Sequence, residues 1–114
     1  MNSLETAKKI ATLLDDKKGK DITILDITEA TSLGDYFIIV SATSTPQINA
    51  LVDEVDEKMK LDGVKLMHKE GSNASMWVLM DFGDIILHVF HEETREFYGI
   101  ERLWSDAPKI EFAV

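Results

Sequence analysis

The feature that most constrains the fold of this chain is a continuous apolar run at residues 36–40, which reads Tyr-Phe-Ile-Ile-Val. A strand with one face in water alternates apolar and polar side chains, and this run does not alternate. It therefore predicts a strand that is covered on both faces. Such strands are typical of α/β proteins, in which helices pack on the sheet.

A helix is expected soon after this strand. Ser44 or Thr45 can cap the free amides of its first turn, and Pro46 suits that turn because its missing N–H costs nothing there. Gly63 is a natural C-terminal stop. Apolar residues between these points recur at helical spacing. They predict a buried stripe of Ile48, Leu51, Val52, Val55 and Met59.

The remaining hydrophobic patterns predict a single α/β domain over residues 1–107. Residues 81–84 separate two apolar strands by a spacing typical of a tight hairpin, with Gly83 supplying a positive φ. Pro108 is expected to end regular structure and to leave a short, loose C-terminal tail, residues 108–114. The whole pattern gives a mixed sheet of about five strands flanked by helices. The other expected elements are helices over 4–19 and 91–98 and strands over 21–27, 64–68, 76–80 and 85–90.

The composition excludes several classes of protein. The chain is 45% hydrophobic, enough to build a core, so a disordered chain is not expected. It has no cysteine, which removes disulfides, thiolate nucleophiles and cysteine-ligated metal sites. It also lacks an apolar run of about 18 residues and the basic and apolar regions of a secretory signal. We therefore expect no membrane association and a cytoplasmic location.

The net charge of -9, from 21 acidic and 12 basic residues, indicates which kinds of partner the chain is suited to bind. Binding to a phosphate backbone draws its affinity from clustered Lys and Arg. The one short basic run, residues 17–20, is explained more simply as a solvated helix end beside the negative pole of the helix. An acidic surface suits a basic protein better than bare nucleic acid or an anionic membrane.

Three carboxylates raise the question of a metal site. Asp35, Asp81 and Asp84 could in principle share Mg²⁺, as paired carboxylates do in phosphoryl-transfer enzymes. Asp81 and Asp84 flank a turn, however, where Asp is common because its side chain bonds nearby amides. The triplet Asp81-Phe82-Gly83 also matches a kinase motif, but the chain lacks the other kinase signatures and is far too short. We predict no metal ligand.

The histidines do not predict a catalytic site either. His88 and His91 are three residues apart, an odd spacing that sends strand side chains to opposite faces. No histidine lies beside an evident serine nucleophile. We therefore predict no catalytic residue and no cofactor.

The aromatic residues of the last third are more informative. Trp77 opens a strand, Tyr98 ends a helix and Trp104 lies near the expected tail. Trp and Tyr are enriched at protein interfaces because they bury large areas with few torsions and keep a polar handle. Packing in the core is the alternative for Trp77 and Tyr98. A tryptophan at position 104, near the expected tail, is explained only if the tail folds back onto the domain or a partner covers the ring.

These segments together resemble the bacterial ribosomal silencing factor (RsfS) family, which is related to the plant protein iojap. The resemblance covers roughly residues 3–107 and is specific because its motifs keep their order and spacing. The family often has Tyr at position 97 and Leu at position 100, where this chain has Phe97 and Ile100, changes that preserve apolar bulk. The similar segments are residues 34–39, 70–71, 77–84, 88–90, 95–98 and 101–107.

The resemblance implies a protein that is not an enzyme and needs no cofactor. Members of the family bind the large ribosomal subunit through ribosomal protein fourteen, uL14, on the face that meets the small subunit. There they block an intersubunit bridge and repress translation when nutrients are short. Some members form homodimers, and no direct contact with nucleic acid is required. The implied fold is nucleotidyltransferase-like, without the catalytic carboxylates of that superfamily.

From the residues and the resemblance together we hypothesise a partner-binding site. Aromatic side chains would anchor the partner, while Asp81 and Glu101 would set its orientation against Lys or Arg. The residues expected to line or support the contact are Trp77, Met80, Asp81, His88, Phe90, Tyr98, Glu101 and Trp104.

Two other classes of function remain open at this point. A metal-dependent nucleotidyltransferase-like enzyme would bind nucleotide through Asp35, Asp81 and Asp84, although fold analogy is poor evidence for activity. An RNA-binding factor of ribosome assembly would bind naked rRNA with an affinity that falls steeply with salt. The acidic balance of the chain argues against this second alternative.

Overall fold

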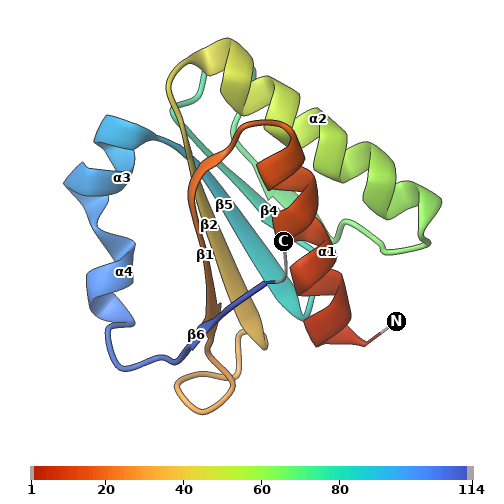
Figure 1. Cartoon of the computed structure of the whole chain (residues 1–114), viewed down its shortest axis with the longest axis vertical. Helices are drawn as coiled ribbons and strands as arrows, with labels where there is room; N and C mark the ends of the chain where they lie inside the picture. Colours follow the sequence, from red (N-terminus) through yellow and green to blue (C-terminus); the bar gives the residue numbers. More distant parts are fainter. Residues whose placement is uncertain (1, 113–114) are drawn as a thin grey trace.

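The computed structural model describes residues 2–112 as a six-stranded mixed sheet with helices on both sides (Figure 1). The strands lie in the order β3-β4-β5-β2-β1-β6. The α/β prediction is therefore confirmed, with six strands in place of the expected five. In chain order the elements are α1 (Ser3–Asp16), β1 (Lys20–Asp26), β2 (Tyr36–Ala42), α2 (Thr45–Leu61), β3 (His68–Glu70), β4 (Trp77–Asp81), β5 (Ile85–His91), α3 (Glu92–Tyr98), α4 (Ile100–Leu103) and β6 (Lys109–Ile110).

The apolar run at residues 36–40 forms the central strand β2, which confirms the prediction of a strand covered on both faces. It pairs in parallel with β5 and antiparallel with β1. Residues 37–42 are all buried. The parallel pair is the one exception in a described sheet whose other neighbours are antiparallel, so the sheet is mixed.

The main core lies between the sheet and the two long helices α1 and α2. The buried residues of α2 are the five of the predicted stripe. Its N-cap is Ser44, whose side chain accepts a hydrogen bond from the Gln47 amide at 3.2 Å. In α1 the same role falls to Asn2, which accepts from the Glu5 amide at 2.8 Å. No helix within residues 2–112 is long and apolar enough to cross a membrane.

The prediction of a loose tail after Pro108 is wrong for the part of the tail that the structure describes. The Pro108 carbonyl accepts a hydrogen bond from the Asp26 amide at 2.8 Å, and β6 pairs with β1. Phe112 then packs against the main core. A pairing of two residues leaves no periodic signal in the sequence, which is why it was not expected. Residues 113–114 of the predicted tail lie outside the described residues.

Two further boundaries differ from expectation. The strand expected over 64–68 is β3, which begins only at His68. Val64 and Leu66 gave the apolar signal because they pack against the core from an irregular connection. The short helix α4 was not predicted, since four residues are too few for a recognisable period.

The opposite face of the sheet carries a smaller apolar cluster. Its buried members come from β1, the residue that follows it, β2 and β5, and half-buried residues of β4, β5, α4 and the turn after α4 pack around them. Figure 1 shows α3 and α4 on the side of the sheet away from α1 and α2. The cluster consists of Leu25, Ile27, Phe37, Ile39 and Phe90, with Trp77, Ile86, Ile100, Trp104 and Ala107 around them.

Candidate partner-binding surface

An aromatic surface occupies the face of the sheet that α1 and α2 leave open. Alternate strand residues point to the same side of a sheet, which brings together residues far apart in the chain. Trp77 of β4 lies opposite Phe90 of β5, and His88 lies between Leu79 of β4 and Ile39 of β2. We call this set the aromatic face; its members are Phe37, Trp77, His88, Phe90, Tyr98 and Trp104.

The rings of the aromatic face form a continuous series of contacts. The Trp77 ring stacks on Phe90 with centroids 4.7 Å apart and contacts Tyr98 at 5.1 Å. At the other end the Phe37 ring meets His88 at 5.0 Å and Trp104 at 5.2 Å, both edge to face. Such pairs add attraction beyond the burial of area. These contacts hold the side chains of Trp77, Tyr98 and Trp104, which come from separate elements, in fixed positions.

His88 lies at the centre of this face with only 5% of its surface exposed. Its Nδ1 accepts a hydrogen bond from the Trp77 indole Nε1 at 3.2 Å, so the proton of the neutral ring is on Nε2. Within the described residues, that buried Nε2 has no hydrogen-bond partner. Burial lowers the pKa of His88 from 6.5 to about 4. The ring is therefore neutral near pH 7 and serves packing rather than proton transfer.

The aromatic members of the predicted site differ in how far a partner can reach them. Tyr98 is 53% exposed, and Trp77 and Trp104 are half-buried. His88 and Phe90 are buried beneath them and can only support the surface. The structure thus brings all five aromatic residues of the hypothesis to one face.

Met80 lies elsewhere and cannot line this surface. It is fully buried in the main core, below α1 and α2. The physical reason is the strand period: Trp77, Leu79 and Asp81 share one face, and Val78 and Met80 share the other. The expectation that Met80 contacts a partner therefore receives no support from its position.

Of the three carboxylates considered as metal ligands, those of Asp35 and Asp81 accept local hydrogen bonds, while Asp84 contributes its backbone carbonyl. Asp81 Oδ1 accepts from the Gly83 amide at 2.7 Å, which is the turn chemistry expected there. Asp35 Oδ2 accepts from the Ser3 hydroxyl at 3.1 Å, and the Asp84 backbone carbonyl accepts from the Asp35 amide at 2.7 Å. Across residues 2–112, no three His, Asp or Glu side chains gather in a way that could hold a metal ion.

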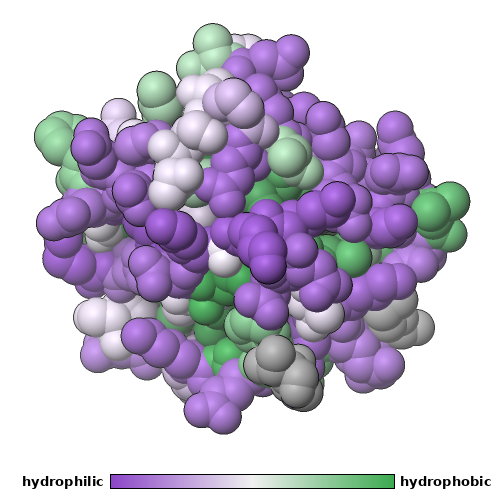
Figure 2. Space-filling model, turned by 45° about the horizontal axis from the view of Figure 1, so that its top comes forward, coloured by the Kyte–Doolittle hydropathy of each residue, from purple (hydrophilic) through white to green (hydrophobic). Residues whose placement is uncertain are grey.

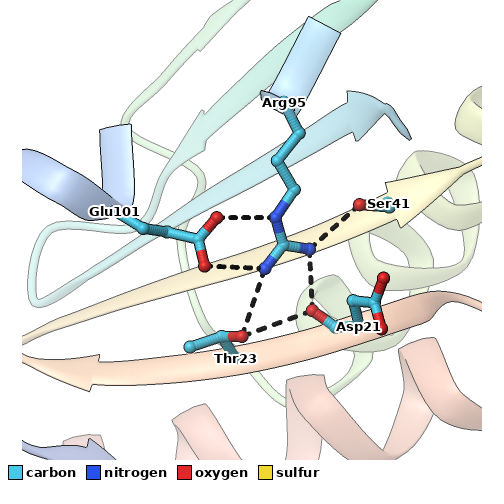
Figure 3. Close-up of polar contacts among 5 residues, drawn as sticks. All are labelled: Asp21, Thr23, Ser41, Arg95 and Glu101. Atoms are coloured by element: carbon cyan, nitrogen blue, oxygen red, sulfur yellow. Dashed lines mark hydrogen bonds and ion pairs between the residues drawn. The ribbon is translucent and has the colours of Figure 1, made fainter. Parts of the chain in front are cut away.

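Glu101 is paired inside the molecule, with a residue that the sequence did not single out (Figure 3). Its two carboxylate oxygens accept from Arg95 Nε at 2.8 Å and from Arg95 Nη2 at 3.0 Å. These hydrogen bonds lower the pKa of Glu101 against the opposing effect of burial. The carboxylate predicted to orient a partner cation is therefore already committed to Arg95.

Exposed apolar side chains extend the aromatic face along α3 and α4. Phe97 is 79% exposed and Leu103 80%, and neither belonged to the predicted site. A hollow of about 440 Å³ opens beside Leu103 and Trp104, and Asp26, Glu29 and Asp106 line it. Figure 2, by contrast, shows a face that is mainly hydrophilic, with its hydrophobic groups in small separate patches.

Comparison with known proteins identifies the family. The whole chain, residues 1–114, matches the family model described as "Ribosomal silencing factor during starvation". The chain belongs to this family. The resemblance stated from the sequence motifs is thereby confirmed.

Relatives from two bacteria show how closely the chain follows the ribosomal silencing factors. It is 40% identical to the ribosomal silencing factor of Chromobacterium violaceum over 100% of this chain and 93% of that protein. It is 37% identical to that of Bacillus subtilis over 95% of this chain and 92% of the relative.

A solved structure supports the fold. A crystal structure of a Chromobacterium violaceum protein superimposes with a TM-score of 0.89 at 39% sequence identity, covering 100% of this chain and 94% of that one. The mixed sheet with its two helical layers is therefore the architecture of a ribosomal silencing factor.

Proposed function

We propose that this chain acts in the cytoplasm by binding the large ribosomal subunit through uL14. Bound there, it blocks an intersubunit bridge and prevents the small subunit from joining. The observation that carries this proposal is the aromatic face, with Trp77, Tyr98 and Trp104 accessible on a strongly acidic protein. Membership of the ribosomal silencing factor family supports a ribosomal target.

The preformed packing of the aromatic face favours tight binding. A side chain that is free in solution loses rotamer entropy when a partner fixes it. Trp77 is already held between Phe90 and Tyr98, and Trp104 already rests on Phe37. Docking on these rings therefore costs less ordering than docking on mobile side chains. Buried Trp and Tyr are also the residues that most often dominate interface energies.

Charge supplies the second argument. The net charge of -9 favours a basic partner, because opposite charges speed encounter and disfavour wrong partners. Acidic residues border the exposed apolar side chains, with Asp26, Glu29 and Asp106 around the hollow at Trp104. A protein rich in Lys and Arg can place its apolar groups on the rings and its charges against this border.

Size supplies the third argument, because exclusion of the small subunit requires bulk and no chemistry. The chain measures 33 × 33 × 28 Å along its principal axes. A body of this size on the joining face would keep the two subunits too far apart to contact each other. The proposed mechanism therefore needs only affinity for the large subunit and the volume of the folded domain.

The direct experiment mixes the purified chain with separated ribosomal subunits and measures joined ribosomes on sucrose gradients. We expect joined particles to decrease and the chain to sediment with large subunits. Normal joining at saturating chain would reject the proposal.

Two variants locate the surface. Tyr98→Ala removes an exposed ring from the aromatic face, and we expect it to weaken binding to large subunits. Leu61→Ala is the matched control, because Leu61 is 74% exposed but lies at the end of α2 in the other helical layer. Equal binding by both variants would place the contact elsewhere on the molecule.

A further inference from the structure

The polar side chain of Arg95 attaches the helices α3 and α4 to the sheet. Arg95 is the only residue classed as buried within these two fully described helices. Their remaining contacts with the sheet come from half-buried or exposed side chains such as Ile100 and Tyr98. A helix of seven residues and another of four are not stable by themselves. Their position must therefore depend on tertiary contacts. The Arg95 side chain makes several of these contacts.

The Arg95 guanidinium joins four elements, and all of its nitrogens donate (Figure 3). Besides the bidentate bond to Glu101 of α4, Nη1 donates to the Asp21 carbonyl at 2.7 Å and to the Ser41 hydroxyl at 3.0 Å. Nη2 also donates to the Thr23 hydroxyl at 3.2 Å. One side chain thus connects α3 and α4 to β1 and β2.

The backbone of β1 is shaped to make this contact. Asp21 has a φ of 50°, a conformation that residues other than glycine rarely adopt, and the register of β1 against β2 shifts between Lys20 and Thr23. This irregularity presents the Asp21 carbonyl to Arg95. Irregular strands next to a functional surface often redirect a group in this way.

We infer that the Arg95–Glu101 pair is a positioning device for the partner-binding surface. It bridges the Gly99 turn between α3 and α4, where the backbone takes a left-handed φ of 54°. By fixing both helices to β1 and β2, it holds Tyr98 against Trp77 and keeps the turn after α4, which carries Trp104, close to Phe37. This inference rests on the proposed function and names the residues that set the geometry of its surface.

Loss of the pair should change the population of the competent surface rather than the fold. The main core between α1, α2 and the sheet contains none of the Arg95 contacts. Without the pair, α3 and α4 open from the sheet in a fraction of the molecules. The apparent affinity for a partner falls in proportion to the fraction that remains closed.

The experiment compares the wild type with Glu101→Gln, Arg95→Met and the double variant. Each is titrated against purified large ribosomal subunits, and hydrogen exchange is measured at the amides of α3 and α4. We expect each single variant to bind at least about tenfold more weakly. The double variant should bind no more weakly than Arg95→Met, because the two residues act as one unit. Exchange should rise in α3 and α4 and stay unchanged in α1 and α2.

The control separates positioning from general loss of stability. Val55→Ala removes buried volume in α2, so it should lower the melting temperature but leave the affinity of the folded chain unchanged. Glu101→Gln keeps the shape of the side chain and decides the matter if Arg95→Met does not fold. Wild-type affinity in folded Glu101→Gln would overturn the inference. So would weaker binding with unchanged exchange in α3 and α4, because that result means direct contact of Glu101 with the partner.

Failure of the proposed function gives a different result. In that case the wild type itself does not bind large subunits, while the exchange measurements on the variants still report whether the pair holds α3 and α4. Unchanged exchange in all three variants would then reject the positioning role by itself.

Discussion

The indole Nε1 of Trp77 donates a hydrogen bond to Nδ1 of His88 at 3.2 Å, from one strand to its neighbour on the face of the sheet that carries α3 and α4. This bond requires an unprotonated Nδ1 and therefore a neutral imidazole. Phe90 and Tyr98 contact the same indole, so the protonation state of His88 is coupled to the packing of the aromatic face. A histidine in this face thus has a structural role that its sequence position did not distinguish from a surface residue.

Acidification should destabilise the protein through His88. The pKa of His88 is about 4 in the folded chain and 6.5 in the unfolded chain. The unfolded chain therefore takes up the proton first as pH falls. The free energy of unfolding should therefore be fully retained above pH 6.5 and decline below it. We expect a loss of about 2 kcal/mol at pH 5, measured by urea unfolding.

The same measurement on His88→Leu isolates this contribution. Glu101 and Asp26 have lowered pKa values, and the stability they add is lost only at lower pH, as their carboxylates become protonated. Between pH 7 and 5 the variant should therefore lose much less stability than the wild type. A wild-type stability that is flat over this interval would contradict the assignment.

Trp77→Phe should cost stability through the lost hydrogen bond. Phenylalanine keeps an aromatic ring against Phe90 but leaves Nδ1 of the buried His88 without its donor. A buried acceptor left without a partner costs about 1–3 kcal/mol. Trp104→Phe is the matched control, since its ring contact with Phe37 can be kept. Equal losses in the two variants, measured by urea unfolding, would show that ring size rather than the hydrogen bond decides the effect.

Met80→Ala should separate the core from the surface. The side chain is fully buried in the main core, so truncation should lower the free energy of unfolding by about 2–5 kcal/mol. The affinity of the folded variant for large subunits should stay at the wild-type value, because Met80 lies on the opposite face from Trp77. A loss of affinity in protein that circular dichroism shows to be folded would restore Met80 to the site.

The sequence correctly predicted features that depend on the local spacing of residues. Its predictions were wrong where tertiary contacts determine the secondary structure. The stripe of α2 and the hairpin turn at Gly83 follow from spacing and turn chemistry, and both were correct. The pairing of β6 with β1 has no pattern of its own and requires knowledge of the sheet edge. The beginning of β3 at His68 was missed because Val64 and Leu66 pack on the core without forming a strand.

The candidate site divides in the same way. Residue type alone named Trp77, Tyr98 and Trp104 as candidate interface residues, and the structure places them on one face of the sheet. Met80 belonged to the same hypothesis but lies on the other face, because successive strand residues point to opposite sides of the sheet. Arg95 was missed because an arginine among glutamates in a short helix looks solvated, and only the fold shows that its guanidinium points at β1 and β2.

Gly99→Ala tests whether backbone conformation or crowding maintains the turn between α3 and α4. The φ of 54° is unfavourable for alanine by about 1–2 kcal/mol. A Cβ at this position would also lie 2.1 Å from Nη2 of Arg102, but that atom ends a flexible, exposed side chain and can move away. We therefore expect Gly99→Ala to cost about 1–2 kcal/mol in urea unfolding, both in the wild-type chain and in an Arg102→Ala background. If the cost disappears in that background, the Arg102 contact rather than the left-handed φ requires the glycine.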